Sequence, residues 1–203
     1  GLTGLIAPAV NGFILALLAT SGTAAIAAYG VASRVEGLVF VILMGLATGM
    51  GPVLGQNWGA GQYERVHKTL KKAFGFVAVW SVIVAVILGI GATQIAGIFS
   101  DNQDVIMITA AYFMIVPFTY VLGNLSNGWS SAFHALGLPI HGLGVVIVKN
   151  IILTIPLAWL GATYYGYAGI FAALAAVNVV TGIGCHVWGR RVTHHRAAAN
   201  KTP

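Results

Sequence analysis

The stretch Gly55-Gln56-Asn57-Trp58-Gly59-Ala60-Gly61-Gln62, with the basic segment that follows it to Lys72, decides how this chain folds. It separates two long apolar blocks and holds four of the ten lysine and arginine residues. Its three glycines interrupt a helix and let the backbone turn. Its tryptophan suits the headgroup level of a bilayer. The pattern predicts that the chain leaves a membrane here and then enters it again.

The segment 61–72 is amphipathic. Glu64 precedes Lys68 by four residues, which is the favourable order for an ion pair on one helical face. Arg65, Lys68 and Lys72 form a basic stripe, and apolar residues lie elsewhere on the helix. We expect a short helix that lies along anionic headgroups, with the next span starting near residue 72. The alternative is a solubilising loop.

The composition excludes a water-soluble domain. Hydrophobic residues make up 58% of the chain, charged residues only 7%, and the mean hydropathy is +0.89. A soluble domain has about a quarter of its residues charged. The apolar runs are continuous and do not alternate with the period of two that a membrane barrel requires. Helices remain as the way to satisfy backbone groups in lipid, so we expect an all-α membrane protein.

A membrane span needs about 20 largely apolar residues. We expect Pro117 to kink the fourth span, Asp101 to cap its start, and Gly51-Pro52 to bend or end the second span. Residues 127–142 read as a connection. The predicted lobe covers residues 1–188, and residues 189–203 form a basic tail. The lobe holds six spans in three hairpins, at residues 5–20, 24–54, 72–99, 103–126, 143–160 and 167–187.

Charge asymmetry predicts the orientation. The segment 55–72 and the tail each hold four lysine and arginine residues, whereas the turns at 20–23, 100–104 and 161–166 hold none. The positive-inside rule then places the chain start, the 55–72 segment and the tail in the cytoplasm of a multi-pass protein in the cell's inner (plasma) membrane. The chain starts almost inside a helix at Gly1, so we expect further sequence before it.

Three charged residues fall inside the predicted spans: Arg34, Glu36 and Lys149. Burying each costs a few kcal/mol, so such residues usually face the bundle interior or a wet cavity. Glu36 lies roughly 18 Å into its span at about 1.5 Å per residue. Its carboxylate could hold Na⁺, exchange a proton or meet a cationic substrate; the alternative is a structural partner for Lys149 or Arg34. Lys149 lies nearer an end of its span, where it is expected to snorkel to the interface.

Uncharged polar side chains complete the candidate set. Asn11 and Asn178 lie near the middle of their spans, and Tyr120 and Asn124 share one face of the fourth. Hydrogen bonds between helices would explain the amides, and lining a cavity is the sharper alternative. The candidates for binding ions or substrate are therefore Glu36, Arg34, Asn11, Tyr120, Asn124 and Asn178. Aromatic residues such as Phe40 could contact lipophilic cations.

Enzyme chemistry finds no support in the sequence. The chain has four acidic residues, two of them in a surface turn, and no carboxylate dyad. Its histidines lack the further convergent ligands that a zinc site needs, and no nucleotide-binding fingerprint is present. The net charge of +6 is explained by basic residues that set the orientation in the membrane and contact lipid headgroups. We therefore expect no catalytic activity, no metal site and no nucleic-acid partner.

Three stretches resemble one transporter family. Gly55 to Arg65 resembles the loop between the second and third helices of the C-terminal lobe in multidrug and toxic compound extrusion (MATE) transporters. The segment 27–36 is similar to that family's eighth helix, and Ile155-Pro156-Leu157-Ala158 to its eleventh. The resemblance implies one six-helix lobe of a twelve-helix exporter of drugs and organic cations, which works by alternating access. It implies Na⁺ or H⁺ as coupling ion and no cofactor. The implied partners are the missing N-terminal lobe, lipophilic cationic small molecules and membrane lipids.

The chain departs from the family at one point. Some members carry an acid in the first or the fourth helix of this lobe, where this chain has none. Either Glu36 carries the coupling, or the coupling acid lies in the missing lobe. Two other functions stay open. A flippase for lipid-linked sugars would need a cavity richer in arginine and lysine, and a non-transporting membrane scaffold would have no polar cavity between its helices.

Overall fold

The computed structural model of the chain describes the backbone of residues 3–199 and the side chains of residues 5–194. The described part contains helices and no strand, which confirms the all-α fold. In chain order the elements are α1 (Thr3–Ala19), α2 (Thr23–Gly59), α3 (Tyr63–Ile90), α4 (Ala92–Phe99), α5 (Gln103–Ile115), the 3₁₀ turn η1 (Pro117–Thr119), α6 (Tyr120–Ala135), α7 (Pro139–Ile147), the π-helix η2 (Val148–Thr154) and α8 (Ile155–Ala199).

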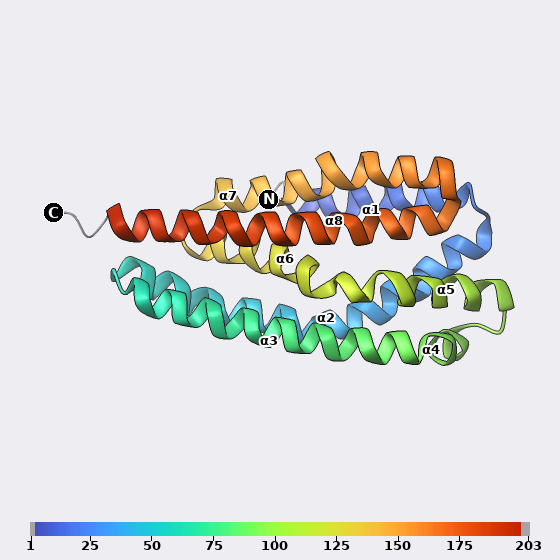
Figure 1. Cartoon of the computed structure of the whole chain (residues 1–203), viewed down its shortest axis with the longest axis horizontal. Coiled ribbons are helices and arrows are strands. Elements are labelled where there is room, and N and C mark those ends of the chain that lie inside the picture. The colour runs from blue at the N-terminus through green and yellow to red at the C-terminus, as the bar shows by residue number, and fades with distance from the viewer. Residues whose placement is uncertain (1–2, 200–203) are drawn as a thin grey trace.

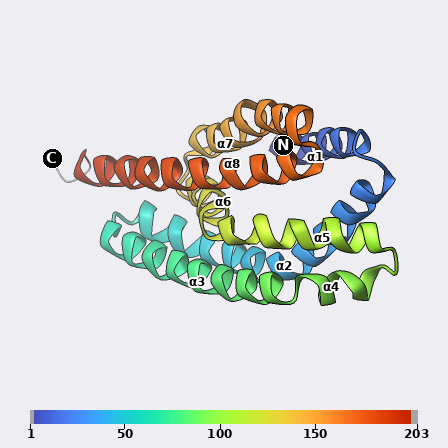
Figure 2. The same ribbon diagram turned by 45° about the vertical axis from the view of Figure 1, so that its right-hand side comes forward.

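The helices form an elongated bundle. In Figure 1, α1, α7 and α8 lie together on one side, α2, α3 and α4 lie on the other, and α5 and α6 lie between them. Figure 2 shows α6 crossing obliquely from one group to the other. Accordingly, α6 packs against α8, α3 and α2. This helix therefore ties the two groups together.

Four segments are long and apolar enough to cross a membrane: Thr23–Gly59, Tyr63–Ile90, Gln103–Ala135 and Pro139–His194. The last is a hairpin, because Gly166 adopts a left-handed conformation (φ 58°, ψ −140°) inside α8 and turns the chain back on itself. That conformation is strained for residues with a Cβ atom. The apolar helix Leu5–Ala19 is shorter. The count of six spans stays a prediction.

The turn after α2 differs from the prediction. Helix α2 runs through Pro52 to Gly59, so of the two expectations for Gly51-Pro52 the end is wrong and the bend stays a prediction. Only residues 60–62 separate it from α3, and Gln62 N–H donates to the carbonyl of Asn57 across this turn (2.8 Å). The basic segment forms the first turns of α3 and not a separate interfacial helix. The ion pair between Glu64 and Lys68 is present at 2.7 Å, as predicted.

Other boundaries are corrected by local contacts. Asn102, not Asp101, caps α5, since its side-chain oxygen accepts hydrogen bonds from the backbone N–H of Asp104 (2.9 Å) and Val105 (3.4 Å). The break at Pro117 is confirmed, because η1 interrupts the helix there. Helix α6 continues to Ala135, so the expected connection over 127–142 shrinks to residues 136–138.

The predicted tail is helical as far as the structure describes it. Helix α8 continues without a break past residue 188 to Ala199. Residues 200–203 of the expected tail lie outside the described residues. The division into a lobe and a tail therefore has no counterpart in a change of secondary structure, and it stays a prediction.

The outer surface is suited to lipid. On α3, exposed apolar side chains recur every three or four residues at Phe76, Val79, Ile83, Ile87 and Ile90. The buried apolar residues form two clusters. One cluster joins α1, α2, α5 and α8 around Phe113 and Phe171, and the other joins α2, α3 and α6 around Trp129 and Phe133. The interior of the lobe therefore has two separate apolar cores.

Candidate binding cavity

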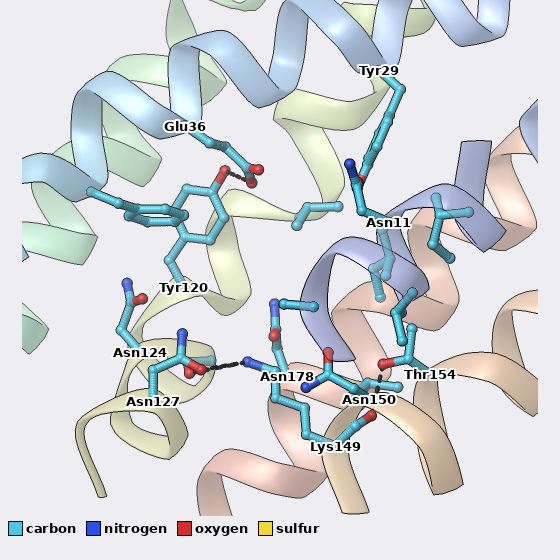
Figure 3. A pocket seen from close by; sticks show the side chains of 18 of the residues that line it. Asn11, Tyr29, Glu36, Tyr120, Asn124, Asn127, Lys149, Asn150, Thr154 and Asn178 are labelled. Carbon is cyan, nitrogen blue, oxygen red and sulfur yellow. Dashed lines mark hydrogen bonds between the residues drawn. The ribbon is translucent and has the colours of Figure 1, made fainter. Parts of the chain in front are cut away.

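A cavity of about 230 Å³ lies between α1, α2, α5, α6, η2 and α8 (Figure 3). Its wall is unusually polar for the interior of an apolar bundle. It carries one carboxylate, one ammonium group, five amides, three phenols and a threonine hydroxyl. These belong to Glu36, Lys149, Asn11, Asn124, Asn127, Asn150, Asn178, Tyr29, Tyr112, Tyr120 and Thr154.

Glu36 projects from the middle of α2 into this cavity and is held by two phenols. The hydroxyl of Tyr112 donates to Glu36 Oε1 at 2.7 Å, and that of Tyr120 donates to the same oxygen at 2.5 Å. Among the described residues, Oε2 accepts no hydrogen bond. The two hydrogen bonds to Oε1 therefore orient the carboxylate, and Oε2 is available to bind a cation or a proton.

The helix break at Pro117 separates these two tyrosines. Residues eight apart on an unbroken helix stand about 12 Å apart along its axis. Tyr112 near the end of α5 and Tyr120 at the start of α6 converge on the carboxylate from either side of η1. Aromatic rings support them: Tyr29 meets Tyr112 edge-on at 6.0 Å, and Phe40 meets Tyr120 edge-on at 5.2 Å. The aromatic contacts limit the positions that the phenols can take.

Lys149 faces the same cavity from η2. Its ammonium group donates to Asn127 Oδ1 (3.1 Å), Ser126 Oγ (3.3 Å) and the carbonyl of Gly123 (3.4 Å), all on α6. The expected snorkelling to the interface is therefore wrong. Within the part of the chain that the structure describes, Lys149 makes no ion pair with Glu36. The two opposite charges share a cavity without touching, as Figure 3 shows.

The π-helix explains how η2 presents several polar groups at once. In a π-helix the hydrogen bonds join residues five apart, and such wide turns occur frequently at functional sites. Thr154 donates to the carbonyl of Lys149, five residues earlier, at 2.8 Å. Pro156 follows and has no N–H for an α-helical hydrogen bond. The wide turn leaves Lys149, Asn150 and Thr154 on the cavity wall.

The predicted amides both bridge helices and line the cavity. Asn11 on α1 accepts from the hydroxyl of Tyr29 at 2.9 Å. Asn124 on α6 donates to Ser81 Oγ on α3 at 3.1 Å, and Asn178 on α8 donates to Thr119 Oγ1 at 3.1 Å. Each of these amides therefore forms a hydrogen bond between helices and also lines the cavity, so the two alternatives do not exclude each other.

Five of the six candidates from the sequence come together here: Asn11, Glu36, Tyr120, Asn124 and Asn178. The sixth, Arg34, is exposed and does not line the cavity. Sequence reasoning missed Tyr29, Tyr112, Asn150 and Thr154. The one usable signal was the placement of Tyr112 eight residues before Tyr120 across a proline. The other positions depend on packing between helices.

A second, largely apolar cavity of about 280 Å³ adjoins the first. Phe40, Asn124 and Asn127 line both. The remainder of its wall includes Met44, Met50 and Phe74, so it combines thioether and aromatic groups. Thioethers and aromatic rings adapt to flat or irregular apolar ligands. Together the two cavities offer one polar and one apolar compartment with a shared wall.

Known transporters are similar to this chain in sequence and in fold. The MatE family model matches residues 2–160. An FAD transporter from Shewanella oneidensis is 29% identical over 94% of this chain and 42% of its own length. The multidrug export protein MepA from Staphylococcus haemolyticus is 23% identical over 89% of this chain and 38% of its own. A mutant of the Vibrio cholerae MATE transporter VcmN superposes with a TM-score of 0.92 at 25% identity, over 96% of this chain and 44% of that one.

The chain thus spans less than half the length of these three proteins, each of which is a transporter or an export protein by name. The match to the family model covers more than half of the chain and includes α1 to α7 and the cavity residues up to Thr154. The chain belongs to the MatE family of membrane transporters.

Proposed function

We propose that this chain is the C-terminal half of a secondary active exporter, which pairs with a second six-helix lobe and works by alternating access. The observation that carries the proposal is the oxygen Oε2 of Glu36, which faces a polar cavity while Oε1 is fixed by Tyr112 and Tyr120. A carboxylate at this depth is an expected position for ion coupling. This chain covers less than half the length of its relatives, which supports a second lobe.

Coupling would follow from competition for one oxygen. A proton or Na⁺ on Oε2 neutralises Glu36, and a cationic substrate at the same oxygen replaces it. The two phenols hold the carboxylate in place in both states. Since only one cation occupies Oε2 at a time, the coupling ion displaces the substrate on the side to which the cavity is open, and the reverse exchange takes place after the cavity opens to the other side.

The substrate class that fits this arrangement best is a lipophilic cation. Its charge meets Glu36, and its rings meet Phe40, Tyr120 and the adjoining apolar cavity. A cation over an aromatic face gains about 0.5–2 kcal/mol. Export of multiple drugs by the relative MepA is in line with this class.

A second candidate is an anionic dinucleotide. Lys149 lies in the cavity and is held only by neutral oxygen atoms, so its charge is available to a phosphate. The relative from Shewanella oneidensis is an FAD transporter. A flippase for pyrophosphate-linked sugars is less favoured, because Lys149 is the one cationic side chain among the described residues that line the cavity. The polar cavity itself disfavours a scaffold.

The test is transport by the protein with all of its sequence, reconstituted in proteoliposomes. Glu36→Gln keeps the size of the side chain and removes its charge. We expect efflux of ethidium, driven by a pH or Na⁺ gradient, to fall at least ~10-fold, since a lost coupling contact of about 1.4 kcal/mol gives this factor. Asp104→Asn, an exposed acid in the first turn of α5, is the matched control. Unchanged efflux in Glu36→Gln would remove Glu36 from the mechanism.

Lys149→Met separates the two substrate classes. If the cargo is an anionic dinucleotide, this variant loses FAD export, whereas Lys72→Met, outside the cavity, does not. If the cargo is a cation, ethidium efflux persists in Lys149→Met and no FAD export is seen in the unmodified protein. Each result assigns one class.

A further inference from the structure

A third cavity, of about 600 Å³, lies where α3 begins and α8 ends, at one end of the bundle (Figure 1). Its wall comes from α3, α6 and α8, and it shares no residue with the cavity around Glu36. The basic residues of the chain predict that this end faces the cytoplasm. We call it the basic cavity, after the residues on its rim: Lys71, Arg190, His67, His186 and His194.

The rim carries positive charge that nothing nearby cancels. Lys71 and Arg190 are exposed, and no carboxylate lines the basic cavity. The ion pair found in the described part of the chain, Lys68–Glu64, involves neither of them. Two permanent cations on adjoining helices repel each other, so an anion between them would lower the energy of this end of the bundle.

Among the histidines of the rim, His186 offers a hydrogen-bond donor. The indole N–H of Trp129 donates to Nδ1 of His186 at 3.3 Å, so the hydrogen of the neutral His186 ring lies on Nε2. His67 donates from Nδ1 to the carbonyl of Tyr63 (2.9 Å) and stacks on His194 at 4.4 Å between ring centres. Its Nε2 is buried and has no partner among the described residues. In the neutral ring this nitrogen is an acceptor, so the donors for an anion come from Lys71, Arg190 and His186.

The floor of the basic cavity is apolar. Leu70, Phe74 and Trp129 are buried there, and Leu125 completes the surface. A small free anion would use the rim and make no contact with this floor. A molecule with an anionic head and an apolar body uses both. Basic residues near a membrane surface also attract anionic headgroups.

We propose that the basic cavity binds the phosphate headgroup of an anionic membrane lipid. The phosphate oxygens accept from Lys71, Arg190 and His186, and the glycerol and first methylene groups lie against Phe74 and Trp129. The lipid joins the start of α3 to the end of α8, two elements that no backbone hydrogen bond connects in the described structure.

Native mass spectrometry of the purified protein, with all of its sequence, tests this. The protein is incubated with phosphatidylglycerol or phosphatidylcholine, and the retained lipid is counted. We expect tighter binding of phosphatidylglycerol, lost roughly 30-fold in the double variant Lys71→Gln/Arg190→Gln, from the attraction of two basic residues near a surface. The control Lys72→Gln/Arg191→Gln removes the same charge one position along each helix, outside the cavity.

Three results would overturn the proposal. Equal loss in both double variants would mean diffuse attraction by the whole basic end. Displacement of the lipid by millimolar inorganic phosphate would assign the rim to a free anion. Equal retention of the two lipids would remove the role of charge. All substituted side chains are exposed, and thermal unfolding of each variant checks that it folds. The outcome is independent of transport.

Discussion

At the scale of single residues, the carboxylate of Glu36 is held by a group of aromatic side chains. Two phenols donate to one carboxylate oxygen, and each phenol is itself packed edge-on against another ring. A hydrogen bond to a charged group contributes about 1.5–3 kcal/mol. The tyrosines therefore orient the carboxylate and also stabilise the junction of α2 with α5 and α6.

Tyr120→Phe tests this contribution, because it removes the hydroxyl and keeps the ring. We expect the free energy of unfolding to fall by about 1.5–3 kcal/mol, measured by thermal denaturation in detergent. Tyr164→Phe is the control, since Tyr164 is 73% exposed. In the Glu36→Gln background the loss should shrink, because the charged acceptor is gone. Equal effects of the two tyrosine variants would contradict the role of Tyr120.

At the scale of elements, the hairpin within α8 depends on close approach of its arms. A Cβ atom added at Gly161 would collide with the backbone of Gly169, and one added at Gly169 would collide with that of Gly161. Small residues allow such contacts between helices in lipid. The hairpin in turn sets where Asn178 stands relative to η2, so the packing of two glycines bears on the shape of the cavity.

Gly161→Ala should therefore destabilise the protein by about 1–3 kcal/mol, as overpacking of a filled interior does. Gly184→Ala on the same helix has open space around it and should be neutral or stabilising by about 0.5–1 kcal/mol. Thermal unfolding of the two variants in one detergent gives the comparison. A loss at Gly184 as large as at Gly161 would show that both report helix propensity and not packing.

The sequence predicts more of the polar interior than of the helix ends. Glu36 stands out because an acid within a span is rare, whatever the packing around it. The sequence places Tyr112 eight residues before Tyr120 across a proline, but the contact of Tyr112 with Glu36 depends on how η1 rotates one half of the helix against the other. The predicted end of the second span, at residue 54, is five residues too early, because Gly51-Pro52 is a pattern that bends or ends many helices. Here the helix continues through Pro52.

At the scale of the whole molecule, the apolar outer face and the polar interior describe a lobe embedded in lipid. The orientation of that lobe rests on charge alone. The turn at residues 60–62 adjoins the basic start of α3. The turn before α5 carries Asp101, and the first turn of α5 carries Asp104. The positive-inside rule places these two turns on opposite sides of the membrane.

Cysteine labelling tests the orientation. The native Cys185 is first replaced by serine, and single cysteines are introduced as Gln62→Cys and Asp101→Cys. In intact cells, a membrane-impermeant maleimide should label the cysteine at 101 and leave that at 62 unmodified until the membrane is opened. The reverse pattern would invert the topology, and labelling of both in intact cells would place the two turns on one side.

The separation of Glu36 from Lys149 across one cavity has an electrical consequence. With its two opposite charges on different walls, the unloaded space is close to neutral overall and acts as a dipole, negative toward α2 and positive toward η2. A zwitterionic cargo would enter with a fixed polarity, its cationic end toward α2. Reversing the two charges by exchange of these residues would turn such a molecule around rather than expel it.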